Sequence, residues 1–147
     1  KLESNSGIGA EGIKILLNGD WPCLEELNLS FLNLNFVDVE TLFQTDKLPV
    51  LHHLDLSCNP GIFRGRSFPS SRLSLKTLML HNCGVDKKDL KWLLKFLKRE
   101  KDLDKLTLSP GYTHKGLLKK IEWQLARNRG EDIQTVGRKP WWRRTRD

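Results

Sequence analysis

Two histidines and an aspartate are the residues of this chain that come nearest to a metal site or an acid–base pair. His53 and Asp55 are two positions apart in Leu51-His52-His53-Leu54-Asp55-Leu56, so both side chains should leave the same side of a strand. His81 follows a similar strand, Leu78-Met79-Leu80. Imidazole and carboxylate groups bind zinc and exchange protons near neutral pH. The sequence offers no fourth ligand and no metal-type spacing, so we predict neither metal binding nor catalysis at this trio.

Other catalytic motifs are missing from the sequence. It contains no Gly-rich phosphate loop, no G-x-S-x-G and no H-E-x-x-H. The segment Gly7-Ile8-Gly9-Ala10-Glu11-Gly12 superficially resembles a dinucleotide-binding fingerprint, but no parallel nucleotide-binding unit follows it. We therefore predict that the chain is not an enzyme and takes no cofactor.

A second candidate site lies near the end of the chain, in Arg138-Lys139-Pro140-Trp141-Trp142-Arg143-Arg144. Trp141 and Trp142 could stack on nucleic-acid bases while Arg143 and Arg144 meet phosphates. The same residues could anchor an acidic protein partner, or the tryptophans could fold back over the preceding structure. Residues 127–147 hold seven basic and three acidic side chains, so we predict a basic tail over 129–147 behind a domain of residues 1–128.

The elements that would position the histidines follow one pattern. Leu75-Lys76-Thr77-Leu78-Met79-Leu80-His81-Asn82-Cys83-Gly84-Val85 matches L-x-x-L-x-L-x-x-[N/C]-x-L, with Val85 in the last apolar place. Leu75, Leu78 and Leu80 should point into a core. Cys83 should turn the backbone out of the strand and form hydrogen bonds with the backbone polar groups of a neighbouring coil, that is, of the adjacent repeat unit. One such unit cannot bury its own apolar side, so the pattern is meaningful only if it repeats.

The pattern does repeat along the chain. Further copies begin at Leu24, at Leu51 with Asn59 in the turn position, and at Leu103, so that the four leading leucines are 27, 24 and 28 residues apart. These steps fall in the roughly 20–29 residue period of leucine-rich repeats. Leu2-Glu3-Ser4-Asn5 resembles the tail of a fifth copy. We therefore expect the chain to be a piece of a longer protein.

The segments between the strands predict helices on most of the connections. Apolar residues at helical spacing predict helices over about 10–18, over about 36–44, from Asp86 as cap to about residue 100, and after Thr113 as cap. In the third helix, Leu90, Leu93, Leu94 and Leu97 should face inward, with lysines on the opposite side. Residues 60–72 contain prolines, serines and arginines and predict an extended loop or single turn instead.

Composition restricts the class of protein. The 147 residues carry a net charge of +7, with 38% hydrophobic and 29% charged residues, as in folded soluble proteins. No apolar run reaches the ~18–20 residues of a membrane span. Three cysteines without a C-x-x-C pair favour reduced thiols and an intracellular setting.

The chain resembles the ribonuclease-inhibitor-like leucine-rich repeats. The resemblance is carried by the four motif copies and by the segment from Asn5 to Leu16, which reads Asn-x-Gly-Ile-Gly-Ala-Glu-Gly-Ile-Lys-Ile-Leu. This subclass occurs in cytosolic nucleotide-binding oligomerisation-type (NOD-like) receptors, ribonuclease inhibitor and tropomodulin-like actin regulators. The resemblance covers residues 1–128. It implies an α/β solenoid, or horseshoe, with parallel strands on the concave face, helices on the convex face and a capping repeat at the C-terminal end. Proteins of this class act by binding other macromolecules, although the fold does not fix the partner.

The resemblance and the strand pattern together lead to one functional prediction. We expect a protein–protein recognition module of a larger protein, with a ligand-sensing or autoinhibitory role. That protein would be cytoplasmic, or alternatively nuclear, and would not associate with a membrane. Its partner would be another protein bound through the concave face, the tail or both. The predicted contact residues are Glu26, Asn28, His53, Asp55, Met79 and His81 on the concave face, and Trp141, Trp142, Arg143 and Arg144 on the tail.

A nucleic-acid-associated module is the alternative. It would use the tail together with the basic helix predicted over 87–101.

Overall fold

Alternation of leucines with polar residues produces short parallel strands. In the computed structural model, which describes residues 9–64, 69–109 and 114–132, they are β1 (Glu26–Asn28), β2 (His53–Asp55), β3 (Thr77–Leu80) and β4 (Lys105–Leu108). Each strand is parallel to the next, in the order β1-β2-β3-β4. Leu27, Leu54, Leu78 and Leu106 occupy matching positions in this register, so the repeated motif predicted the strand pairing correctly.

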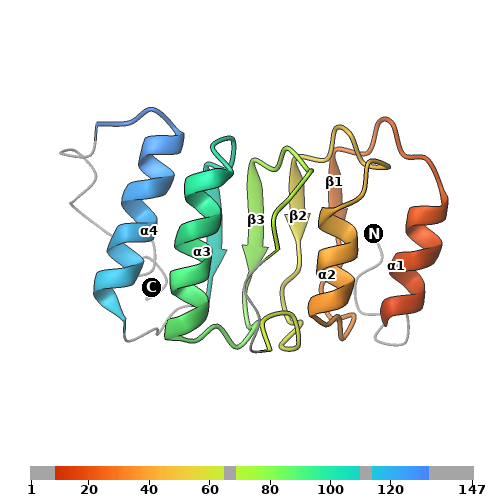
Figure 1. Cartoon of the computed structure of the whole chain (residues 1–147), viewed down its shortest axis with the longest axis horizontal. Helices are drawn as coiled ribbons and strands as arrows, with labels where there is room; N and C mark the ends of the chain where they lie inside the picture. Colours follow the sequence, from red (N-terminus) through yellow and green to blue (C-terminus); the bar gives the residue numbers. More distant parts are fainter. Residues whose placement is uncertain (1–8, 65–68, 110–113, 133–147) are drawn as a thin grey trace, which may run out of the picture.

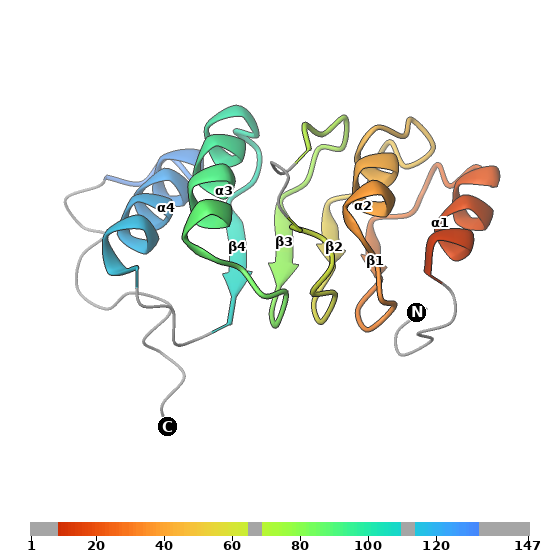
Figure 2. The same ribbon diagram turned by 60° about the horizontal axis from the view of Figure 1, so that its bottom comes forward.

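The helices form a second layer on one side of the sheet. Within the described residues they are α1 (Gly9–Asn18), α2 (Phe36–Phe43), α3 (Lys87–Arg99) and α4 (Lys115–Asn128). Figure 1 shows the helices in front of the strands, and Figure 2 shows them above the strands after the molecule is turned. The prediction of an α/β protein with a parallel sheet is therefore confirmed. The bounds of α1, α2 and α3 agree with the expected helices to within one residue.

The apolar core lies between the two layers. Strand residues such as Leu54 and Leu78 are buried against helix residues such as Leu42 and Leu93. In α3 the predicted inward stripe is correct: Leu90, Leu93 and Leu97 are buried, and half-buried Leu94 packs against the same core. Phe96 is also buried and stacks on Phe43 of α2, with 5.9 Å between the ring centres. The sequence pattern did not indicate this aromatic pair.

The turns that follow β2 and β3 are each held by a buried side chain that forms hydrogen bonds. Asn59 is fully buried; its amide nitrogen donates to the carbonyl oxygens of Leu29, Leu56 and Ser57, at 2.9–3.2 Å. Its amide oxygen accepts from the backbone N–H groups of Leu32 and Leu34 in the preceding turn, at 3.1 and 3.0 Å. One side chain therefore forms hydrogen bonds with five backbone groups, as expected of a polar group that is fully buried.

Cys83 has the equivalent place in the next turn with a simpler set of bonds. Its buried thiol donates to the carbonyl oxygens of Leu56 and His81, at 3.3 and 3.4 Å. The prediction that residues in this position bond a neighbouring coil is confirmed for both side chains. The chain's cysteines, Cys23, Cys58 and Cys83, are all free thiols.

Paired polar residues determine where two of the helices begin. Before α3, the Asp86 carboxylate accepts from the backbone N–H of Asp89, and the Asp89 carboxylate accepts from that of Asp86. Asn35 and Asp38 form the same reciprocal arrangement at the start of α2. These capping boxes satisfy N–H groups that a helix leaves free at its first turn. The predicted cap Asp86 is thus confirmed, whereas the predicted cap Thr113 lies outside the described residues.

The connection from β2 to β3 carries no helix in its described parts, as its composition predicted. It is instead held to the end of α2. The backbone N–H of Arg72 donates to the carbonyl oxygen of Phe43 at 2.7 Å, and Gln44 donates to the carbonyl oxygen of Ser70 at 2.7 Å. The layer of helices therefore has a gap between α2 and α3, where Figure 1 shows β2 and β3 without a helix in front of them.

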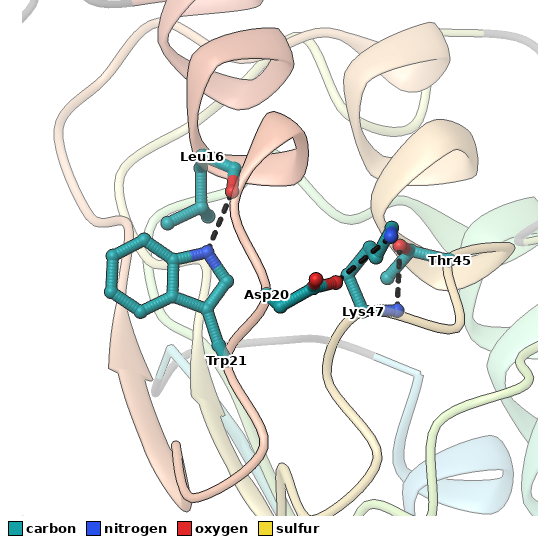
Figure 3. A network of polar contacts seen from close by, with 5 residues as sticks. All are labelled: Leu16, Asp20, Trp21, Thr45 and Lys47. Atoms are coloured by element: carbon teal, nitrogen blue, oxygen red, sulfur yellow. Dashed lines mark hydrogen bonds and ion pairs between the residues drawn. The ribbon is translucent and has the colours of Figure 1, made fainter.

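The loop after α1 is tied to the loop after α2, as Figure 3 shows. The Trp21 indole lies at the end of α1 and donates to the carbonyl oxygen of Leu16 at 2.7 Å. Lys47 pairs with Asp20 at 2.8 Å, and its carbonyl oxygen accepts from the backbone N–H of Trp21 at 3.2 Å. Neighbouring coils are therefore joined at this end as well as through the sheet.

The last helix closes the opposite end of the core. Asn128, at the end of α4, donates to the carbonyl oxygens of Leu97, Glu100 and Leu103 at 2.6–3.3 Å. Leu118, Ile121 and Leu125 of α4 are buried against this end, as their spacing predicted. Through residues 9–64, 69–109 and 114–132, no helix combines the length and the apolar character needed to cross a bilayer.

Candidate functional site on the open sheet face

The side of the sheet that faces away from the helices brings most of the predicted contact residues together. We call it the open sheet face and define it by the outward residues of the four strands. In the strand register, Glu26, His53, Thr77 and Lys105 form one row, and Asn28, Asp55, Met79 and Thr107 form the next. No helix of the described residues covers this face (Figure 2).

Exposure differs between these rows. Glu26, His53 and Lys105 are exposed, whereas Asn28, Asp55 and Met79 are half-buried. The exposed row carries a carboxylate on β1 and an ammonium on β4, with an imidazole and a hydroxyl between them. The open sheet face therefore presents opposite charges at its two ends, with a thioether at its centre.

Two of the predicted contact residues also have a structural role. The side-chain oxygen of Asn28 accepts from the backbone N–H and the hydroxyl of Ser30, at 2.9 and 2.7 Å. The carboxylate of Asp55 accepts from the backbone N–H of Ser57 at 2.9 Å. Both are short Asx-type turns that begin the exit from a strand. Replacing either residue would therefore disturb the turn as well as the surface, so neither is a clean probe of binding.

His81 lies at the carboxyl edge of the sheet, one row beyond Met79. Its backbone N–H donates to the hydroxyl of Ser57 at 3.1 Å, and its carbonyl oxygen accepts from the backbone N–H of Cys58 at 2.7 Å. In the next turn, the hydroxyl of Ser109 donates to the side-chain oxygen of Asn82 at 3.0 Å. Ser57 and Ser109 thus join successive turns along this edge, with His81 between them.

The trio of His53, Asp55 and His81 is not brought together as a ligand set. His53 and His81 are two rows apart, which corresponds to roughly 13 Å along the strands at about 3.3 Å per residue. Among the described residues, no group of three or more His, Cys, Asp or Glu side chains has the proximity to hold a metal ion. The open sheet face therefore offers surface contacts rather than a coordination site.

Phe31 is an exposed residue at this edge that the sequence analysis did not single out. It follows Ser30 with φ of 60°, and its ring is 54% exposed. Cys58 and Asn82 have φ of 59° and 53° at the equivalent places of the next turns. A bulky aromatic residue is disfavoured in this left-handed region, so the turn holds the ring outside the core at an energetic cost. Nothing in the motif distinguishes Phe31 from an ordinary turn residue.

The other predicted contact residues, Trp141, Trp142, Arg143 and Arg144, lie outside the described residues, as does the rest of the tail from residue 133 onward. The sequence matches no protein-family model and no curated protein. Function is therefore inferred from the chemistry of the surfaces. The open sheet face can offer charge pairing, hydrogen bonds and one apolar contact to a partner across adjacent strands.

Proposed function

We propose that this chain is a leucine-rich-repeat module of the ribonuclease-inhibitor-like kind that binds another protein through the open sheet face. The observation that carries the proposal is that every helix of the described residues lies on the same side of the sheet, so that the other side remains free (Figure 2). A parallel sheet is usually covered on both faces. A repeat solenoid is the arrangement in which one face of a parallel sheet stays open and serves for binding.

Two further observations support the assignment to this kind of repeat. The strands pair in phase with the four copies of the sequence motif, so that each motif leucine stands beside its counterpart. Asn59 and Cys83, the two turn residues of the motif, each bond the backbone of the coil before them. The three free thiols favour an intracellular protein.

The side chains on the open sheet face indicate what kind of partner would bind there. Glu26 at one end and Lys105 at the other favour a partner with a basic group and an acidic group arranged across four strands. Met79 between them offers a soft apolar contact. Phe31 adds an exposed ring at the edge of the sheet, and such rings often contribute much of the binding energy of an interface.

The double substitution Glu26→Ala with His53→Ala tests this proposal. Both side chains are exposed and adjacent in the strand register, so their loss should weaken partner capture by roughly tenfold while the thermal unfolding temperature stays nearly unchanged. The measurement is a quantitative comparison of proteins retained from a cell extract by the immobilised wild-type chain and by the variant.

The matched control is Asp46→Ala with Lys101→Ala, two exposed charged residues in loops that follow helices. A specific partner should be retained by the control variant and by the wild type but lost from the open-face variant. Equal retention by all three proteins would rule out the open sheet face as the contact surface.

One observation favours the nucleic-acid alternative. Lys87, Lys88, Lys91, Lys95 and Lys98 are all exposed on α3. If this helix binds nucleic acid, oligonucleotide binding to the chain should fall steeply as salt is added, because phosphate contacts release counterions. Salt-insensitive retention of a protein would favour the open sheet face instead.

A further inference from the structure

A groove lies on the helical side of the molecule, where the connection from β2 to β3 leaves a gap between α2 and α3. It has a volume of about 650 Å³, within the range of roughly 300–1,000 Å³ typical of binding pockets. We call it the α2–α3 groove. Its lining comes from both helices and from the connection between them: Phe36 and Glu40, Pro69 and Ser70, and Trp92, Lys95, Lys98 and Arg99.

The walls of the α2–α3 groove are held in place by bonds that do not involve the groove-lining cations. The two helices meet through the stacked rings of Phe43 and Phe96. Between them, Gln44 donates to the carbonyl oxygen and the hydroxyl of Ser70, at 2.7 and 3.2 Å. A preorganised groove binds a ligand without the entropic cost of ordering its own walls.

The charge of the groove is strongly one-sided. Among the lining residues that the structure describes, Lys95, Lys98 and Arg99 bring three cations, whereas Glu40 is the one carboxylate. None of these three cations forms an ion pair within the part of the chain that the structure describes. They are exposed, so they can meet an incoming acidic group without first losing a partner.

The groove also has an apolar component. Phe36 and Trp92 are half-buried and belong to opposite walls. The ammonium of Lys88 lies 4.7 Å from the centre of the Trp92 ring, a cation–π contact that restrains the indole. A ligand that fits must therefore combine negative charge with an apolar group.

We propose that the α2–α3 groove binds an acidic peptide segment of a partner protein, with an aromatic or aliphatic side chain between Phe36 and Trp92 and flanking carboxylates on Lys95, Lys98 and Arg99. This surface is separate from the open sheet face and lies on the other side of the sheet. Glu40, on the wall opposite the cations, disfavours a continuous phosphate backbone but can accept from peptide N–H groups. The chain's own residues 127–147 are predominantly basic and are therefore disfavoured as the occupant.

The test uses the full chain and a fluorescein-labelled synthetic peptide with one Trp between two runs of Asp and Glu. Fluorescence anisotropy should report binding that weakens by roughly tenfold in the double variant Lys95→Glu with Lys98→Glu. A second peptide with Ser in place of Trp should bind several-fold more weakly to the wild type. The variant Glu26→Ala with His53→Ala should bind the acidic peptide as the wild type does, which separates this site from the open sheet face.

The matched control is Lys115→Glu with Lys120→Glu, two exposed lysines of α4 that give the same change in net charge away from the groove. Equal losses in the two double variants would overturn the proposal, because the peptide would then respond only to overall charge. Equal binding of the Trp and Ser peptides would also overturn it. Tighter binding of an oligonucleotide, or of a peptide of residues 133–147, at the same lysines would identify a different occupant.

Discussion

At the scale of single residues, Asn59 and Cys83 show two chemical solutions for the same place in a turn. Asn59 both donates and accepts, and so bonds two coils from one position. Cys83 only donates, through a weak thiol donor, and relies more on burial in an apolar environment. Burial has a second effect, because a charged thiolate is poorly stabilised there, and the pKa of Cys83 rises from 9.0 to about 11.

The raised pKa predicts that the chain loses stability at alkaline pH. Above pH 9.0 the Cys83 thiol of the unfolded chain gives up its proton, whereas that of the folded chain keeps it until about pH 11. Deprotonation therefore favours the unfolded state in this window. Between pH 8 and 10, the free energy of unfolding of the wild type should fall by about 1.4 kcal/mol more than that of Cys83→Ala, measured by urea unfolding.

The other thiols provide an internal check on this prediction. Cys23 is exposed and should react with a thiol reagent at pH 8 long before Cys83, with half-buried Cys58 between them. Rapid labelling of Cys83 in the folded chain, or identical pH dependence in the wild type and the alanine variant, would contradict the assigned burial.

At the scale of elements, the start of α3 depends on one reciprocal pair. Hydrogen bonding from the backbone N–H of Asp89 lowers the pKa of Asp86, while burial raises the pKa of Asp89. The pKa values of the two carboxylates therefore shift in opposite directions, although each carboxylate accepts from the backbone N–H of the other residue. Asp86 is the charged acceptor that fixes the first turn of α3, and with it the position of Lys95 and Trp92 on the groove wall.

Replacement of Asp86 by alanine should lower the free energy of unfolding by about 1 kcal/mol, since the first turn loses its cap. The folded-state pKa lies below the ordinary value of 3.8, so this contribution is present above about pH 4 and lost as the pH falls. The stability difference between wild type and variant should therefore shrink in acid. Chemical denaturation at pH 7 and pH 3 measures it, with exposed Asp102→Ala as a control that should change little.

Sequence reasoning located the helices and strands well because their signals are local. The leucine spacing fixed the strand register, and the helix bounds followed from apolar periodicity and from Asp86. It did not find the α2–α3 groove, because the groove is formed by Phe36, Ser70 and Trp92, which are far apart in the sequence. It also missed Phe96 as a core residue, since a leucine pattern cannot indicate that Phe96 stacks on Phe43 of another helix.

The candidate site was only partly predictable for the same reason. Alternation correctly placed Glu26, His53 and Asp55 on one face of adjacent strands. It could not show that Asp55 is engaged by the backbone N–H of Ser57, because that bond depends on how the chain leaves the strand. Nor could it distinguish Phe31, whose exposure follows from a backbone conformation rather than from its residue type.

At the scale of the whole molecule, a repeat module of the kind that we propose is stabilised mainly by contacts between neighbouring units, so its two ends are the vulnerable places. Asn128 illustrates how one end is secured, because its amide reaches carbonyl oxygens in the last turn of α3 and in the loop between α3 and β4. Trp21 and Lys47 make corresponding links near the other end (Figure 3).

Replacement of Asn128 by alanine should loosen the C-terminal end without unfolding the remainder. Three carbonyl oxygens lose a donor, which should cost about 1–3 kcal/mol locally. Hydrogen exchange followed by mass spectrometry should show faster exchange over α4 and little change over α1. Asn18→Ala, at the exposed end of α1, is the control. Uniformly faster exchange through the chain would mean that the coils do not respond separately.

The sequential order of the sheet has a kinetic consequence. Each strand pairs only with the strands before and after it in the chain, so folding never requires the two distant ends to meet. In the repeat module that we propose, any adjacent pair of units can nucleate folding, and order then spreads from that pair in both directions. Refolding should therefore be quick for a parallel sheet, and mechanical pulling on the termini should peel off coils one after another rather than rupture the molecule at once.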